Sequence, residues 1–347
     1  DENVDMEIWK WERIESEKQI YHLRSALLED GFHELSVFRQ CQVLTNLANL
    51  YDKVGRFVEA LEYWRRAISV SSSFGPASGN LGMGLAHYAN SLYDPGHQVV
   101  FLKKSLAYLK SALETQLHPN ARQSFEEKRL EILARLSSDF EKQDFDLENY
   151  SLGDSGSEIE YRKWCLSKGL FLNPLNDLGP YPIAARDIFT APSIVYGLGE
   201  NPSYHGFFNQ MKQEYVSARY FFYEGIHAKS IHFSDKGVLL YNTLDYPLYS
   251  LAAEKMRAAF RLTYSLFDKI AYFLNAYLSL GIPEKRVNFR TFWYEKQRRE
   301  RGLKSDLRGR QNWPLRGLFW LSKDLFEDKE GFKDSTEPGA RDLADIR

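Results

Sequence analysis

Apolar side chains recur every three or four positions along most of this 347-residue chain, which predicts a mainly α-helical protein. The longest seam runs from Tyr249 to Leu280 and contains Met256, Ala259, Thr263, Phe267, Ile270, Leu274 and Tyr277. Gly281 and Pro283 follow it, and a glycine that accepts a left-handed backbone, followed by a proline, typically ends a helix. A second helix is predicted over Pro314–Phe326, and a third begins at residue 337.

The stretch from Leu44 to Ser72 has the pattern of a helix–turn–helix repeat. Its marker residues are Leu47, Ala48, Tyr51, Gly55, Phe57, Ala60, Trp64 and Ala67. The alanines let two antiparallel helices approach closely, and the aromatic rings fill the gaps between them. Leu81, Gly82 and Leu85 repeat the first half after 34 residues, and the second half returns, after an insertion, at Ser105, Leu109, Ala112 and Leu113. A third unit is expected around residues 121–140. The pattern resembles the tetratricopeptide family over roughly residues 36–135, which implies a concave binding surface.

Segments of different character flank these repeats. Residues 1–35 read as a polar helical cap, and Tyr150–Glu158 is a Ser- and Gly-rich linker. Farther on, Phe207–Tyr223 is a predicted helix and Ile231–Tyr241 a predicted β-hairpin with its turn at residues 234–237. We therefore predict a helical-repeat domain over 1–149, a linker over 150–158, an irregular middle region over 159–245 that packs on the C-terminal domain, and a helical domain over 246–347.

The composition argues against a disulfide-rich, zinc-thiolate or membrane-spanning protein. The net charge of −2 favours no kind of partner by itself. The two cysteines, Cys41 and Cys165, indicate neither a disulfide framework nor a thiolate zinc site and suit a reducing compartment. No apolar run approaches the ~20 residues that span a bilayer, and the acidic start has no signal-peptide pattern. We therefore expect a cytoplasmic protein without a membrane segment, in a chain that begins after residues not included here.

Other signals for bound groups are weak. His227, His232 and Asp235 are conceivable metal ligands, but exposed histidines on a hairpin are the commoner interpretation. The glycines at 79, 82 and 84 lie in a helical repeat rather than after a strand, so they do not indicate a phosphate-binding loop. We predict no metal and no cofactor.

A basic segment lies between the first two C-terminal helices. Residues 284–316 contain eleven Lys or Arg against four acids, with Phe289, Phe292, Trp293, Tyr294 and Trp313 among them. Cations neutralise phosphates and aromatic rings stack on unpaired bases, so this segment is the best candidate for an RNA-binding surface. The alternative is that the FRTFW stretch packs in the core and the following stretch is a solvated loop. The candidate RNA-binding residues are Lys285, Arg286, Arg298, Arg299, Arg301, Arg308 and Arg310.

The long predicted helix also carries a polar line, formed by Arg257, Arg261, Ser265, Asp268 and Asn275. Their spacing puts them on one face. In one interpretation these residues line a cleft and Asp268 supports a catalytic residue. In the other they are the solvated face that every amphipathic helix has. The second interpretation is the commoner one.

Four stretches at the C-terminal end resemble the HEPN domain of a bacterial subgroup that carries tetratricopeptide-like repeats. They are residues 253–283, FRTFWYEK (289–296), LRGLFWLSKDLFE (315–327) and ARDLADIR (340–347). Residues 161–179 and 209–225 resemble the region that precedes this domain. The resemblance covers roughly residues 160–347. It implies a helical bundle that dimerises and cleaves RNA without metal, using an Arg followed four to six residues later by a His.

By this resemblance Arg347 is the catalytic Arg of that motif, and in the functional interpretation of the polar line Asp268 supports it. All eight histidines lie before the long helix, so the motif His is absent from this sequence. Either the sequence ends within the motif or the protein is a degenerate member of the family, and in both cases we expect that this chain by itself does not cleave RNA.

Two hypotheses follow. The first is a HEPN-type, metal-independent endoribonuclease effector in antiviral defence or toxin–antitoxin activity, whose repeat domain senses a trigger or mediates assembly. The second is a non-catalytic scaffold that binds a protein or peptide partner on its repeats and dimerises through the HEPN-like bundle. Both predict a homodimer or larger homo-oligomer, and the first adds RNA as a partner.

Overall fold

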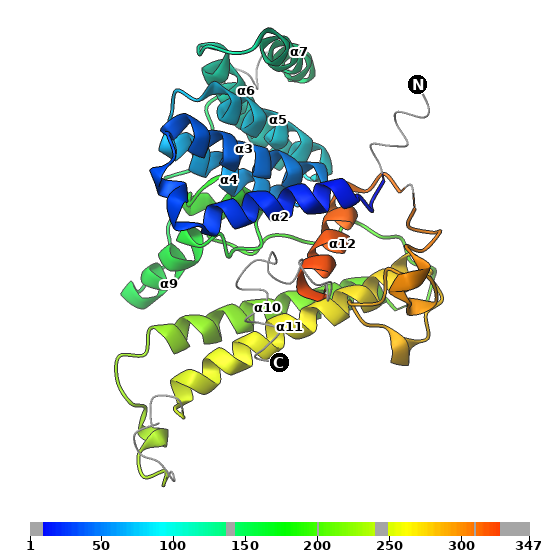
Figure 1. The fold of residues 1–347 in the computed structure, drawn as a ribbon. Coiled ribbons are helices and arrows are strands. Elements are labelled where there is room, and N and C mark those ends of the chain that lie inside the picture. Colours follow the sequence, from blue (N-terminus) through cyan, green and yellow to red (C-terminus); the bar gives the residue numbers. More distant parts are fainter. Residues whose placement is uncertain (1–9, 137–142, 200, 240–248, 309, 327–347) are drawn as a thin grey trace. The chain divides into compact units, whose positions relative to one another are not determined.

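The computed structural model describes residues 10–136, 143–199, 201–239, 249–308 and 310–326. The described chain is mainly helical, as predicted (Figure 1). It divides into two compact units. Unit 1 comprises residues 1–150, 174–184 and 303–347, and unit 2 comprises residues 151–173 and 185–302, each as far as the structure describes it. The domain boundaries predicted from the sequence remain predictions.

Unit 1 contains the helical repeats. Helix α2 (Ile14–Leu28) is followed by α3 (Val37–Lys53), α4 (Phe57–Val70), α5 (Gly75–Ser91), α6 (Pro95–Leu113) and α7 (Pro119–Arg135), and successive helices pack against one another. The predicted marker residues form the core, with Leu47, Ala48 and Tyr51 fully buried. The prediction of N-terminal helical repeats is therefore confirmed.

Helix α5 depends on its glycines for packing. A Cβ atom at Gly84 would lie 2.4 Å from the ring of Trp64, and one at Gly79 would lie 2.0 Å from the ring of Phe125. These rings come from the neighbouring helices α4 and α7. The glycines therefore let the helices approach closely in the repeats, in agreement with their placement in a helical repeat rather than a phosphate loop.

The last described helix, α12 (Trp313–Phe326), belongs to unit 1 and packs on the first repeat. Trp313 Nε1 donates to the carbonyl of Asp52 at 2.7 Å, and Trp320 Nε1 donates to the carbonyl of Trp11 at 2.9 Å. The Trp313 ring also stacks on Phe57, with ring centroids 4.7 Å apart. The helix predicted at Pro314–Phe326 is thus present, and aromatic side chains attach it to α3, α4 and the segment before α2.

A buried group of charges completes this attachment. Asp324 on α12 accepts two hydrogen bonds from the Arg24 guanidinium, at 2.8 and 3.0 Å, and a further one from Arg56. These side chains have exposed fractions of 6% for each arginine and 8% for the aspartate. Arg24 Nε also donates to the Tyr51 hydroxyl at 2.6 Å. One carboxylate therefore joins α12 to α2 and to the start of α4.

Residues 174–184 also pack in unit 1, where Pro174–Leu178 and Pro182–Ala184 form short 3-10 turns. The Tyr88 hydroxyl donates to Asp177 Oδ2 at 2.5 Å, and Lys104 Nζ donates to the Tyr181 hydroxyl at 3.0 Å. Burial raises the pKa of the Asp177 carboxyl to about 6, although the bond from Tyr88 and the charge of Arg65 favour its ionised form. These bonds hold the two turns against α5 and α6.

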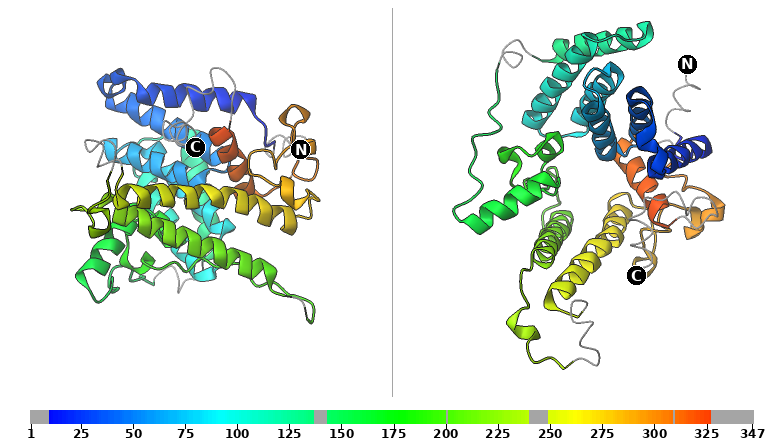
Figure 2. Two further views of the ribbon diagram at one scale, coloured as in Figure 1. Left: turned by 90° about the horizontal axis from the view of Figure 1, so that it is seen from below. Right: turned by 60° about the vertical axis from the view of Figure 1, so that its left-hand side comes forward.

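Unit 2 is built on α9 (Gly156–Ser167) and the long helices α10 (Ser203–Ile226) and α11 (Leu251–Tyr277). Figures 1 and 2 show α10 and α11 side by side, and the two helices make extensive contacts. Phe207 near the start of α10 stacks on Tyr272 near the end of α11, while Gly225 at the other end of α10 lies against Ala252. The pair is therefore antiparallel.

Helix α11 lies within the predicted range but ends before the predicted Gly281. The Ser250 hydroxyl accepts the N–H of Ala253 at 3.3 Å at its start, and Ser279, with a left-handed φ of 53°, follows the last cap residue, Leu278. The helix is somewhat shorter than the predicted Tyr249–Leu280. Within the described residues, no helix combines the length and apolar character needed to cross a bilayer.

The predicted β-hairpin is wrong for the residues that the structure describes. Residues 231–239 contain no strand, and Phe233–Asp235 forms a 3-10 turn. The His232 carbonyl accepts the Asp235 N–H at 3.0 Å, so local bonds occupy backbone groups that a hairpin would pair. Ile231 and Phe233 are 58% and 75% exposed, so their apolar side chains have no core to face. Residues 240 and 241 lie outside the described residues.

We predict that Gly317→Ala destabilises the protein. A Cβ at Gly317 would lie 2.2 Å from the Gly55 carbonyl oxygen, and Gly55 itself has φ of 89°, so neither backbone can accommodate a side chain. Overpacking against backbone typically costs about 1–3 kcal/mol, which urea unfolding monitored by circular dichroism will measure. Gly206→Ala on α10 is the control, because nothing lies within 4 Å of its Cβ. It should be neutral or stabilise by up to about 1 kcal/mol. Equal effects of both substitutions would contradict the close contact.

We also predict that Asp177 makes stability fall as pH rises from about 4 to about 6. Its folded-state pKa of about 6 exceeds its ordinary value of 3.8, so the folded protein retains a proton that the unfolded chain has released. Each unit of difference is worth about 1.4 kcal/mol, so up to about 3 kcal/mol is lost across this window. Asp177→Asn keeps an acceptor for Tyr88 and should flatten the curve. Parallel pH profiles for the two proteins, measured by urea unfolding, would refute this assignment.

Candidate nucleic-acid interface

Two side chains of α11, Asn275 and Asp268, form hydrogen bonds with the backbone of the segment that follows this helix. The Asn275 amide bonds both backbone groups of Ile282: its Nδ2 donates to the carbonyl at 2.9 Å and its Oδ1 accepts the N–H at 3.1 Å. Asp268 Oδ1 accepts the N–H of Phe289 at 2.9 Å. Two members of the predicted polar line therefore position the segment, a role that the sequence analysis missed. The signal was an Asp and an Asn on the polar side of a helix that is followed by a sharp reversal of the chain.

The aromatic side chains within the basic segment form a core. Phe289, Phe292 and Trp293 are 0% exposed, and Tyr294 is 6% exposed. Phe289 packs edge-on against Trp293 and contacts the ring of Phe267 on α11, with centroids 5.5 and 5.2 Å apart. Of the two interpretations of the FRTFW stretch, core packing is the one observed. These rings hold the basic turns in place.

Three short turns carry the cations: Glu284–Arg286, Glu295–Gln297 and Arg299–Arg301. Gln297 Nε2 donates to the carbonyl of Arg286, which ties the second turn to the first. The Glu295 N–H donates to the Gly302 carbonyl at 3.0 Å and closes the loop that holds the second and third turns. The structure thus brings Lys285, Arg286, Arg298, Arg299 and Arg301 together in unit 2.

The cations of this group face solvent. Residues 284–302 contain seven Lys or Arg and three Glu, and Lys285, Arg286, Arg298 and Arg301 are exposed. No described carboxylate forms an ion pair with any of these four side chains. Exposed cations without neutralising partners are what a phosphate-binding surface requires.

The other two predicted residues, Arg308 and Arg310, lie in unit 1. Arg308 Nε donates to the Leu303 carbonyl at 3.0 Å, and Arg310 Nε donates to the Asp306 carbonyl at 2.6 Å. The carbonyl of Arg310 in turn accepts the Trp11 indole N–H at 3.1 Å. Both arginines therefore also stabilise the chain that leads into α12.

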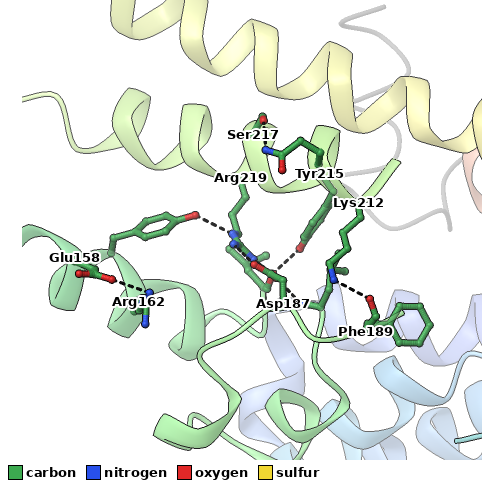
Figure 3. A network of polar contacts seen from close by, with 12 residues as sticks. Glu158, Arg162, Asp187, Phe189, Lys212, Tyr215, Ser217 and Arg219 are labelled. Carbon is green, nitrogen blue, oxygen red and sulfur yellow. Dashed lines mark hydrogen bonds and ion pairs between the residues drawn. The ribbon is translucent and has the colours of Figure 1, made fainter. Parts of the chain in front are cut away.

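A second polar network in unit 2 surrounds Arg219 on α10 (Figure 3). Its guanidinium forms two bonds with Asp187, at 2.7 and 2.8 Å, and donates to the Tyr161 hydroxyl at 2.9 Å. It also donates to the Leu170 carbonyl at 2.8 Å. Burial disfavours the charged guanidinium, but the pairing with Asp187 outweighs it and raises the pKa of Arg219. Arg219 is 6% exposed and surrounded by these acceptors, so it holds Leu170 and Asp187 on α10 rather than facing a substrate.

Two further titratable side chains near this network, Tyr161 and Cys165, are held in their neutral forms. Burial raises the pKa of Tyr161 to about 12 and also raises the pKa of the Cys165 thiol. A reactive cysteine needs the opposite shift, because the thiolate is the nucleophile. Cys165 is therefore a packed core residue.

The histidines considered as metal ligands make local contacts. His227 Nδ1 lies 2.9 Å from the Tyr223 carbonyl, and His232 Nδ1 accepts the Ser234 N–H at 3.2 Å. Asp235 accepts the N–H of Leu251 at 2.9 Å at the start of α11. Across the described ranges, no three His, Cys, Asp or Glu side chains are grouped so as to hold a metal ion.

Arg347, the predicted catalytic residue, lies outside the described residues, and so does the helix predicted from residue 337. Asp268 is described, and it bonds the Phe289 N–H. Its support of Arg347 remains a prediction.

Comparison with known proteins identifies the C-terminal part of the chain. Residues 195–347 match the model of the LA2681-like HEPN family. No curated protein and no solved structure matches the chain.

We predict that Asp268→Ala lowers the free energy of unfolding more than Asp268→Asn does. Alanine leaves the Phe289 N–H without its acceptor, which costs about 1–3 kcal/mol, whereas the asparagine carbonyl can still accept it. Thermal and urea unfolding will measure both variants. Ser265→Ala is the control, because that hydroxyl bonds only within its own helix, to the Leu262 carbonyl. Equal stability of the alanine and asparagine variants would contradict the structural role.

Proposed function

Residues 195–347 belong to the HEPN family, and from this premise we propose that the protein is a metal-independent endoribonuclease effector. HEPN proteins are usually linked to RNA cleavage, which supports an activity on RNA. The observation that carries the proposal beyond the family is the group of exposed cations at residues 284–302, where Lys285, Arg286, Arg298 and Arg301 have no described acidic partner. A polyanion is the natural ligand of such a surface.

The proposed chemistry follows the HEPN resemblance. Arg347 would hold the scissile phosphate and the negative charge that grows on it in the transition state, since a guanidinium stays protonated and donates two parallel bonds. A histidine four to six residues later would move the proton of the attacking 2′-hydroxyl or the leaving oxygen. Neither step needs a metal ion. Asp268 is proposed to support Arg347.

We place this activity in a cytoplasmic homodimer or larger homo-oligomer that acts in antiviral defence or as a toxin. Pairing of HEPN domains would bring two motifs into one cleft. The helical repeats would sense a trigger or hold the subunits together, through a protein or peptide partner. The attachment of α12 to the first repeat supports a connection between the two functions, because α12 lies within the HEPN match.

One observation favours the alternative, a non-catalytic scaffold. The buried Arg24–Asp324–Arg56 group shows that part of the HEPN match is used for packing inside the protein. In a scaffold, the repeats would bind a partner and the HEPN region would only dimerise. The two functions differ in whether RNA is cleaved.

We predict that the full-length protein cleaves labelled single-stranded RNA or transfer RNA in the presence of EDTA. Arg347→Ala should lower the rate by about 100-fold or more, the usual effect of removing one preorganised charge-stabilising group. Arg39→Ala is the control, an exposed arginine on α3 that lies outside the HEPN match. Retention of cleavage by the Arg347 variant would exclude Arg347 as the catalytic residue. Absence of cleavage by both proteins, with no growth arrest in cells that express them, would favour the scaffold.

A further inference from the structure

The cationic turns of residues 284–302 offer charge without stacking surfaces. All residues of this stretch are described, and its four aromatic rings have exposed fractions between 0% and 6%. Tyr272, whose hydroxyl bonds Glu284, is half-buried with its ring stacked on Phe207 at 5.6 Å. Unpaired bases bind proteins largely by stacking on aromatic side chains, which contributes about 1–3 kcal/mol per base. Such a surface can contact phosphates but cannot recognise unpaired bases in this way.

The turns also have a fixed shape. Gln297 Nε2 bonds the Arg286 carbonyl and lies 3.5 Å from the Thr291 hydroxyl, and Asn288 Oδ1 accepts the Thr291 N–H at 2.9 Å. Lys296 and Gln297 are consecutive non-glycine residues with φ of 50° and 55°. A left-handed conformation at two such positions is strained and persists only where the surroundings impose it. The cations are therefore attached to a preorganised backbone.

Fixed cations without stacking rings favour double-stranded over single-stranded RNA. A single strand bound at fixed phosphate positions loses conformational freedom, and without stacking nothing in this surface compensates for that loss. A duplex is already ordered, so its regularly spaced phosphates can be bound with little further loss of entropy. Proteins recognise double-stranded RNA mainly by shape and by contacts to phosphates and 2′-hydroxyls.

We propose that the surface formed by Lys285, Arg286, Arg298 and Arg301 binds base-paired RNA through its phosphates, without regard to sequence. The proposal rests on RNA being the ligand of the proposed function, and it names the form of RNA that is held. A duplex stem of a structured RNA would be bound here, and this binding need not coincide with the point of cleavage.

The test measures binding by the full-length protein carrying Arg347→Ala, so that no cleavage interferes. Fluorescence anisotropy will compare two RNA duplexes of unrelated sequence with single strands of uridine and of adenosine, all with equal numbers of phosphates, at several salt concentrations. We expect each duplex to bind about tenfold more tightly than either single strand. The two duplexes should bind equally.

Arg298→Gln combined with Arg301→Gln should weaken duplex binding about tenfold. The slope of log affinity against log salt should also fall by about 1–2, since about one counterion is released per phosphate contact. Arg39→Gln combined with Lys110→Gln is the matched control, because it removes the same charge from exposed positions in unit 1. The control should bind duplex RNA like the parent protein. Circular dichroism will establish that both double variants are folded.

Three results would overturn the proposal. The first is tighter binding of the adenosine strand than of either duplex, because that would show base stacking. The second is unchanged duplex binding in the Arg298 and Arg301 variant. The third is displacement of the duplex by polyglutamate of equal charge, which would indicate an acidic protein partner. Duplex binding without RNA cleavage by the unsubstituted protein would support this proposal and contradict only the proposed nuclease.

Discussion

The buried carboxylate of Asp324 is the constraint on which unit 1 depends. It lies between two arginines that are 300 and 268 residues away in the sequence, and each of the three side chains is less than a tenth exposed. Two guanidinium groups this close repel each other unless an anion lies between them. Removing one partner of a buried ion pair typically costs about 3–5 kcal/mol, because the remaining charge is left unpaired away from water. The packing of α2 on α12 therefore keeps the charges of Arg24 and Asp324 paired, whereas Arg56 also pairs with Glu59 at 2.6 Å.

The contrast between buried and exposed arginines separates structure from candidate function. Arg24, Arg56 and Arg219 each bond a carboxylate in the interior and each fix a segment distant in sequence. Arg298 and Arg301 are exposed and have no described acidic partner. Arginine side chains therefore have two roles in this protein. Burial and ion pairing, rather than residue type, distinguish the structural arginines from those that can bind a ligand.

The sequence was informative where the evidence for a structure is local. The periodicity predicted α11 and α12, although α11 ends at Tyr277, before the predicted Gly281, and the left-handed residue after its cap is Ser279. The sequence could not predict which helices α12 packs against, because no residue near Asp324 in the sequence indicates that its partner is Arg24, near the other end of the chain. The hairpin prediction failed because Ile231 and Phe233 satisfy a strand pattern but have no second sheet or core to pack on. Aromatic residues interleaved with cations likewise suggested base stacking, whereas Phe289 and Trp293 are core residues that position the turns.

The HEPN match and the compact units divide the chain differently. The match runs from residue 195 to residue 347, yet α12 within it is held in unit 1 by Asp324, Trp313 and Trp320. The residues leading to Arg347 thus follow a helix whose position depends on the repeats. An effector can shift an equilibrium only by the difference in its affinity for the two states. A partner that binds the repeats and alters the contacts of Arg24 or Arg56 with Asp324 would have different affinities for the states with and without these contacts. Under the proposed function, a trigger that binds the repeats would act on the C-terminal region through this packing of α12.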